Sequence, residues 1–277
     1  DMLQFALRLG DKPQVCVTTT PRNVGVLKEL LKAPSTVVTH APTEANAANL
    51  ASSFLEEVRT RYAGTRLGRQ ELDGVLLEDA EGALWTTAGI AACRVRDTQA
   101  LDRIVVALDP STTGSASSDE CGSVVAGVTM QGPPQDWRAV VLADCTVAGA
   151  SPSAWARAAI EAMELYGADR LIAEVNQGGQ MVEEVLRQVD PLVPVTAVHA
   201  SRGKSARAEP IAALYEQGRV RHMPGLEALE DQMCRMTVQG YEGRGSPARV
   251  DALVWALHAL MIEPVAKWRA PRVRTLW

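Results

Sequence analysis

The chain has 277 residues, of which 47% are hydrophobic and 22% charged, and its 33 acidic and 28 basic side chains give a formal charge of −5. At roughly 150 residues per domain, this length predicts about two globular units, and no apolar run reaches the roughly 18 residues of a membrane-spanning helix. The acidic balance excludes a protein that coats nucleic acid through bulk positive charge, so any nucleic-acid site must be local.

The first hundred residues predict short, separate elements rather than one complete domain. In chain order we expect a strand from residue 15, a helix over 24–31, a strand over 36–39 and a helix over 50–62. Glycines and acidic residues then predict loops up to residue 85, and residues 86–102 suit a connector between units. Because the chain begins Asp1-Met2, without Met at position 1, we expect it to be a fragment.

The second unit shows a clearer alternation of strands and helices. Three apolar runs predict a meander of strands over 103–108, 123–130 and 137–143. Helices over 152–166, 179–188 and 205–217 then alternate with strands over 170–173, 193–198 and 219–222, before a helix from 226. Such an order predicts an α/β fold with a mixed sheet and helices on its faces. It is typical of the ribonuclease H-like arrangement.

The last helix is expected to be buried. Ser246 has the residue type of an N-cap, Pro247 suits the first helical position, and the following ARVDALVWALHALMI is apolar almost all round. Asp251 would then lie too deep in the helix to cap its free amides. A carboxylate in such a position is costly unless something neutralises it.

Two further carboxylates directly follow buried strands. Asp109 directly follows the run IVVAL, and Glu174 directly follows the run LIA. Both therefore stand at strand ends, where ligands gather in open α/β sheets. If they converge with Asp251, their mutual repulsion predicts bound cations, and oxygen ligands of this kind suit Mg²⁺ or Mn²⁺. We expect two such ions, bridged by Asp109, to catalyse phosphoryl displacement. Asp119 is a candidate fourth ligand, although Asp119-Glu120 equally suits a solvated loop.

Basic residues cluster near the expected position of these carboxylates. Arg202, Lys204 and Arg207 give a local positive excess that suits phosphate contacts, or alternatively a solvated loop. The sequence GKS is not a P-loop, because Val198 stands where that motif requires glycine. The tail over 264–277 is also basic and suits nucleic acid or a partner. No GxSxG, HExxH or GxGxxG motif is present.

The sequence resembles a known family, the large terminase subunit of tailed phages and phage-like gene transfer agents. The resemblance covers most of residues 103–262 and is carried by VVALDPS, SDECG, LIAEVNQGGQMV, RGKSARAEPIAALYEQGRV and ARVDALVWALHAL. It implies a ribonuclease H-like nuclease that cuts concatemeric double-stranded DNA during packaging. The metal-binding acids of the family match Asp109, Glu174 and Asp251, and a basic residue near the scissile phosphate matches Lys204.

The first part of the chain is also similar to that family. VCVTTTPR resembles the segment that couples nucleotide state to movement in the packaging ATPase, which implies that role for Thr18, Thr19 and Thr20 in the parent protein. Both Walker motifs are missing, so no ATPase activity is expected of this chain alone. The resemblance further implies a portal protein and a small terminase subunit as partners, and the cytoplasm of a bacterial host, at the procapsid portal, as location.

The sequence therefore predicts three segments. They are a remnant of the packaging ATPase domain with its linker subdomain over 1–101, a nuclease domain over 102–263 and a basic tail over 264–277. The predicted function is a metal-dependent endonuclease with low sequence preference, because no base-reading element is visible. Two alternatives stay open: a junction resolvase or transposase-type nuclease of the same fold, and a non-catalytic module that docks on a capsid or portal.

Overall fold

The structure is a computed structural model and describes residues 10–21, 24–62, 66–76, 79–110, 120–176 and 179–267. The chain forms two compact units, Asp1–Glu78 and Asp79–Trp277. No helix in the described ranges has both the length and the apolar character that crossing a membrane requires.

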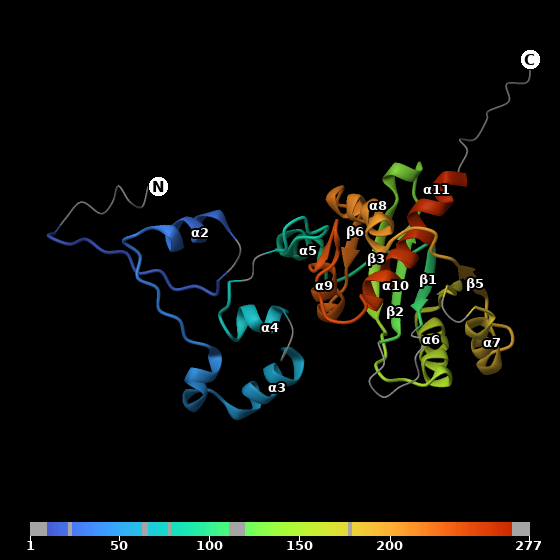
Figure 1. Cartoon of the computed structure of the whole chain (residues 1–277), viewed down its shortest axis with the longest axis horizontal. Helices are drawn as coiled ribbons and strands as arrows, with labels where there is room; N and C mark the ends of the chain where they lie inside the picture. Colours follow the sequence, from blue (N-terminus) through green and yellow to red (C-terminus); the bar gives the residue numbers. More distant parts are fainter. Residues whose placement is uncertain are drawn as a thin grey trace, which may run out of the picture. The chain divides into compact units, whose positions relative to one another are not determined.

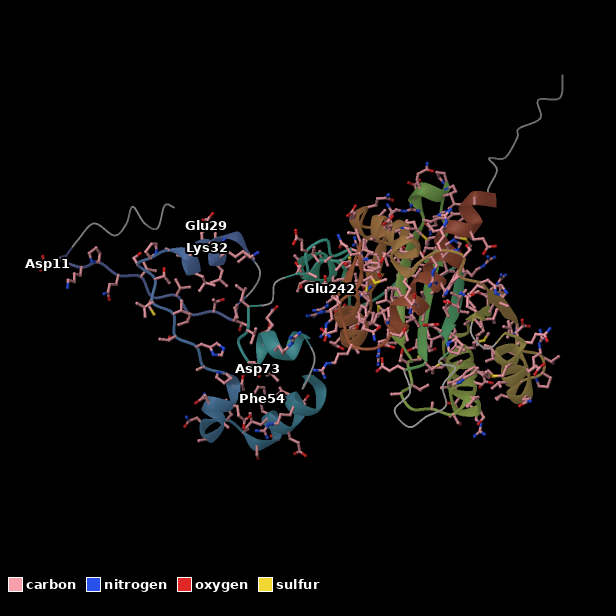
Figure 2. The ribbon with its side chains drawn as sticks, in the orientation of Figure 1. Asp11, Glu29, Lys32, Phe54, Asp73 and Glu242 are labelled. Atoms are coloured by element: carbon pink, nitrogen blue, oxygen red, sulfur yellow. The ribbon has the colours of Figure 1, made fainter. Side chains whose placement is uncertain are left out.

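The first unit contains short helices and no strand within its described residues (Figure 1). They are α2 (Gly25–Lys32), η1 (Thr43–Asn49), α3 (Ser52–Tyr62) and α4 (Arg66–Glu71). The strands predicted from residue 15 and over 36–39 were wrong, because no strand among the described residues pairs with either segment. Val37 is 90% exposed, and Phe54, labelled in Figure 2, is also exposed. Apolar side chains in this unit thus lack the cover that a sheet would supply.

A six-stranded mixed sheet forms the centre of the second unit, in the order β5-β4-β1-β2-β3-β6. The strands are β1 (Arg103–Asp109), β2 (Gly122–Thr129), β3 (Arg138–Asp144), β4 (Arg170–Glu174), β5 (Val195–Val198) and β6 (Val220–His222). The first three are antiparallel, as the meander predicted. β4 is parallel to β1, β5 to β4, and β6 to β3, so the crossovers place helices on the sheet's faces.

Helices cover both faces of this sheet (Figure 1). They are α5 (Thr87–Cys93), α6 (Pro152–Tyr166), α7 (Gln180–Val189), α8 (Lys204–Glu216), α9 (Glu227–Met233) and α10 (Ala248–Leu257). Successive side chains of β1 point to opposite faces of the sheet, and so into two separate hydrophobic clusters. Val105 and Ala107 face α8, α9 and α10, whereas Val106 and Leu108 face α6 and α7. A short 3-10 helix, η2 (Pro134–Asp136), and a hairpin of β7 (Met236–Thr237) and β8 (Gly240–Tyr241) complete the connections.

Residues 79–101 pack with the sheet unit, so the unit boundary differs from the predicted one after residue 101. Trp85, Ile90 and Cys93 are buried in the same core as α8 and α9. The predicted connector instead contains α5. The reason is that this short, alanine-rich helix buries only Ile90 and Cys93, too few apolar positions to show a helical period in the sequence.

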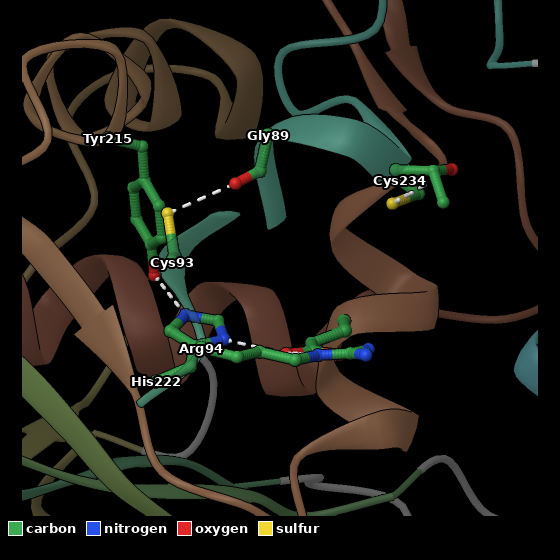
Figure 3. A network of polar contacts seen from close by, with 8 residues as sticks. Gly89, Cys93, Arg94, Tyr215, His222 and Cys234 are labelled. Atoms are coloured by element: carbon green, nitrogen blue, oxygen red, sulfur yellow. Dashed lines mark hydrogen bonds and ion pairs between the residues drawn. The ribbon is translucent and has the colours of Figure 1, made fainter. Parts of the chain in front are cut away.

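A polar network holds the chain just after α5 against the sheet unit (Figure 3). Nε2 of His222, which is fully buried, lies 2.7 Å from the hydroxyl of Tyr215, and its Nδ1 lies 3.0 Å from Oε1 of Glu230. Arg94 donates from Nε to both oxygens of Glu230 at 3.2 Å. The chain after α5 also donates a backbone hydrogen bond from Val95 to the carbonyl of His222.

The last helix differs from its prediction at both ends. α10 begins at Ala248, so Pro247 rather than Ser246 is its N-cap, and no side chain caps the helix. After Leu257 the chain continues as a π-helix, η3 (His258–Ile262), and then as α11 (Glu263–Lys267). The beginning of the predicted basic tail is therefore helical, and the rest of that tail lies outside the described residues.

Candidate active site

Asp109 and Glu174 end neighbouring parallel strands. Leu108 of β1 pairs with Ala173 of β4, so the residue that follows each of them lies at the same edge of the sheet. Both strands have a buried apolar middle, and each changes to a carboxylate at its last position. The structure therefore brings these two predicted residues together by register alone.

Asp251 reaches the same edge from α10, which packs on β1 and β2. Gly122, the residue of β2 that pairs with Asp109, makes this packing possible. A Cβ atom at Gly122 would lie 2.0 Å from the carbonyl oxygen of Ala248, the first residue of α10. The absent side chain thus lets the helix carry Asp251, which is only 1% exposed, toward the end of β1.

Two cations from the start of α8 pair with these carboxylates. Lys204 Nζ lies 2.5 Å from Oδ2 of Asp251 and also donates to the hydroxyl of Ser246 at 2.8 Å. Arg207 bridges two acids: its Nη1 lies 3.3 Å from Oε2 of Glu174, and its Nη2 lies 3.2 Å from Oδ1 of Asp251. Both residues, predicted as DNA contacts, thus pair with acids of the site in this structure.

The site holds more negative than positive charge. Burial, and then the charges of Asp251 and Glu174, raise the pKa of Asp109 to about 8. Burial also raises the pKa of Asp251, and the nearby Lys204 and Arg207 offset part of this effect. Three carboxylates face only two cations, so burial and the charges of the other two acids together favour the protonated form of Asp109.

The chemistry of this donor set fits a divalent cation. Carboxylate oxygens are the ligands that Mg²⁺ and Mn²⁺ prefer, and the shortage of positive charge around Asp109 is the condition that a cation would relieve. Within the described ranges, no three His, Cys, Asp or Glu side chains are already arranged as a metal centre. Glu174 and Asp251 are instead paired with Arg207 and Lys204, so a metal ion would have to share them with these cations.

Trp255 is a site residue that the sequence reasoning missed. It lies four positions after Asp251, on the same face of α10, and its Nε1 donates to Oε2 of Glu174 at 2.5 Å. The guanidinium carbon of Arg207 lies 4.8 Å from the centroid of its ring. The spacing from Asp251 was the available signal, but in an apolar helix this tryptophan looks like an ordinary core residue.

The remaining predicted residues lie elsewhere. Asp119 is outside the described residues, and its neighbour Glu120 pairs with Arg249 rather than being only solvated. Arg202 is exposed in the loop before α8. The threonines at 18, 19 and 20 are exposed in the first unit, where Thr19 donates from its hydroxyl to the carbonyl of Thr20 at 2.9 Å.

The fold and the site define a class of protein. An antiparallel three-stranded meander, extended by parallel strands and carrying acids at the ends of β1 and β4, is a ribonuclease H-like α/β domain. The sequence profile of the family described as "Terminase RNaseH-like domain" matches residues 106–260, more than half of the chain. The chain belongs to this terminase family.

Several solved structures are similar to the chain. The large terminase nuclease of thermophilic phage G20c is 16% identical, with 65% of this chain and 99% of that chain covered and a TM-score of 0.45. The human cytomegalovirus terminase nuclease domain is 16% identical, with 66% of this chain and 97% of that chain covered and a TM-score of 0.47. The nuclease domain of the large terminase subunit of bacterial virus Sf6 is 15% identical, with 64% of this chain and 98% of that chain covered and a TM-score of 0.47. A comparison with curated protein sequences gave no match.

Proposed function

We propose that this chain is a metal-dependent endonuclease that cuts concatemeric double-stranded DNA during genome packaging. The observation that carries the proposal is the convergence of Asp109, Glu174 and Asp251 from β1, β4 and α10 on one edge of the sheet. Membership of the terminase family supports the biological setting. The low sequence preference follows from the absence of a basic recognition helix in the described residues.

The three carboxylates are the groups that would hold two Mg²⁺ or Mn²⁺ ions. Bound there, the ions would supply Lewis acidity, lowering the pKa of a water and stabilising the leaving oxygen of the phosphodiester. The chain's own contribution is to hold the acids in place: β1 and β4 set the positions of Asp109 and Glu174, and α10 sets that of Asp251.

Of the two cations, Lys204 would bind the phosphate beside these carboxylates. Lys204 has 42% of its side chain exposed, so its ammonium can contact a non-bridging oxygen of DNA while staying at the site. Arg207 has only 11% exposed and is better placed to balance the charge of the acids. Arg202, exposed in the preceding loop, would contact the DNA backbone farther from the site.

The proposal also covers the partners of this chain, its place of action and the role of the first unit. The portal protein and small terminase subunit would be the partners, and the procapsid portal in the cytoplasm of a bacterial host the place of action. The first unit would be the end of the packaging ATPase domain, with Thr18, Thr19 and Thr20 serving its coupling only in the parent protein. This chain would hydrolyse no ATP alone, because it carries neither Walker motif.

Plasmid nicking tests the proposal. With Mg²⁺ or Mn²⁺, wild-type protein should convert supercoiled DNA to nicked and linear forms, and Asp109→Asn, Glu174→Gln and Asp251→Asn should each reduce the rate at least about 100-fold. Glu161→Gln, which changes an exposed carboxylate of α6, is the matched control and should retain the wild-type rate. Equal rates in wild-type and Asp109→Asn protein would disprove the proposal.

Substrate choice separates this function from the alternatives of the same fold. A packaging nuclease should cut long linear duplex at least as fast as a four-way junction of the same sequence. Preferential cutting of the junction would favour a resolvase. No cutting of either substrate, with no binding of divalent ions by calorimetry, would favour a docking module instead.

A further inference from the structure

Trp255 and Arg207 hold the same atom of Glu174. The indole Nε1 of Trp255 donates to Oε2 at 2.5 Å, and Nη1 of Arg207 lies 3.3 Å from that same oxygen. No residue that the structure describes donates a hydrogen bond to the other oxygen, Oε1. The carboxylate is therefore held from one side, with one oxygen occupied and the other left for a ligand.

The two donors also support each other. The guanidinium of Arg207 stacks on the indole of Trp255, with 4.8 Å between its central carbon and the ring centroid. Arg207 is anchored a second time by Oδ1 of Asp251, one turn before Trp255 on α10. Because Trp255 is 7% exposed and Arg207 has 11% of its side chain exposed, little water competes for these contacts. Neither donor can move without disturbing the other.

We propose that Trp255 is a positioning residue that, together with the stacked Arg207, fixes the carboxylate of Glu174 so that Oε1 faces the metal ion. This inference rests on the proposed function and adds a residue to its site. Groups that orient a metal ligand through a hydrogen bond typically contribute tenfold or more to metal affinity. Trp255 acts only through Glu174, so it is no metal ligand itself.

A second tryptophan of the same unit provides a comparison. Trp85 is also buried, at 3% exposure, yet its Nε1 makes no hydrogen bond within the described residues. The fold thus tolerates a buried indole N–H without a partner. The short hydrogen bond of Trp255 is therefore not required merely to satisfy an indole in this core, and its acceptor is one of the three carboxylates of the site.

Trp255→Phe removes the N–H and keeps an aromatic ring, and Trp85→Phe is the matched control. Mn²⁺ affinity of the full chain, measured by the electron paramagnetic resonance of free Mn²⁺, should fall about tenfold in Trp255→Phe and stay within about twofold in Trp85→Phe. Quenching of tryptophan fluorescence by bound Mn²⁺ should largely disappear only in Trp255→Phe. Equal affinities in the two variants would overturn the positioning role.

A measurement on wild-type protein covers the case in which Trp255→Phe does not fold. Addition of Mg²⁺ should shift the indole N–H resonance of Trp255 and leave that of Trp85 in place. A Trp255 resonance that ignores saturating Mg²⁺ would overturn the proposal. If Asp109→Asn binds Mn²⁺ as wild type does, the proposed metal site fails. If Asp109→Asn loses binding while Trp255→Phe keeps it, only the positioning role fails.

Discussion

Gly122 lies against the backbone of Ala248, so closely that a Cβ atom on the glycine would stand 2.0 Å from the carbonyl oxygen of the alanine. This contact joins β2 to the first residue of α10. Because Gly122 also pairs with Asp109, the same point sets the height of the helix above the site. Close approach of two backbones here determines how near Asp251 comes to Asp109.

Gly122→Ala should therefore destabilise the protein and weaken its metal site together. We expect the free energy of unfolding to fall by at least about 2 kcal/mol, because the added methyl group must push α10 away from the sheet. Urea denaturation checks this, and Mn²⁺ titration should show weaker binding. Gly127→Ala in the same strand is the control, since its nearest contact is the flexible end of Leu101. Equal losses in both variants would contradict the argument.

Divalent ions should stabilise the folded protein. The site lacks one positive charge, and an ion that binds only the folded state adds about 2.7 kcal/mol of stability at 100 times its dissociation constant. Thermal denaturation with and without Mg²⁺ measures the effect. Asp251→Asn should remove most of it. Equal stabilisation of wild-type and variant protein would place the ion elsewhere.

Glu230 should make stability depend on pH in the acid range. Burial alone would raise the pKa of this carboxyl, but its hydrogen bonds with His222 and Arg94 lower it below its usual value. A lowered folded-state pKa stabilises the protein above about pH 4.5, and this contribution is lost as the pH falls further. Glu230→Gln should cost about 2 kcal/mol at pH 7, a value reduced because the side chain of Arg94 is 44% exposed.

Urea denaturation at pH 7 and pH 3.5 tests this, and the difference between wild type and Glu230→Gln should shrink at the lower pH. Glu216→Gln, an exposed carboxyl at the end of α8, should change stability by less than about 0.5 kcal/mol at either pH. A difference that stays constant with pH would show that the variant loses packing rather than ionic contacts.

Arg249 should stabilise the start of α10 through two acids. Its Nε donates to Oδ2 of Asp144 at 2.8 Å, and its Nη1 pairs with Glu120. Asp144 is nearly buried, and burial already raises its pKa. Arg249→Met would leave this carboxylate without its cation, with only hydrogen bonds from Thr146, and we expect a loss of about 3 kcal/mol at pH 8.

Because a buried carboxyl with a raised pKa costs the folded state stability only where it is ionised, the loss in Arg249→Met should be smaller at pH 5 than at pH 8. The double variant Arg249→Met with Asp144→Asn should recover part of the stability. Urea denaturation of the single and double variants measures both effects. A double variant less stable than Arg249→Met would exclude an unpaired Asp144 as the cause.

Local sequence patterns determined the order of strands and helices in the second unit. Apolar runs predicted β1 to β6 to within about two residues, because a strand buried on both faces needs an unbroken run of such side chains. The same patterns placed Asp109 and Glu174 at strand ends, since a change from apolar to charged residues can be read without knowing the fold. They failed for the strands predicted in the first unit, where no strand in the described ranges pairs with those segments.

Only the tertiary structure decided how the site is assembled. Trp255 lies 81 positions from Glu174 in sequence, and Arg207 lies 33 positions from Glu174 and 44 from Asp251, so no local pattern links them. Whether Lys204 and Arg207 face DNA or the acids depends on where α8 starts relative to α10. Close packing at Gly122, rather than any residue's own preference, sets how α10 lies on the sheet and so where Asp251 and Trp255 stand.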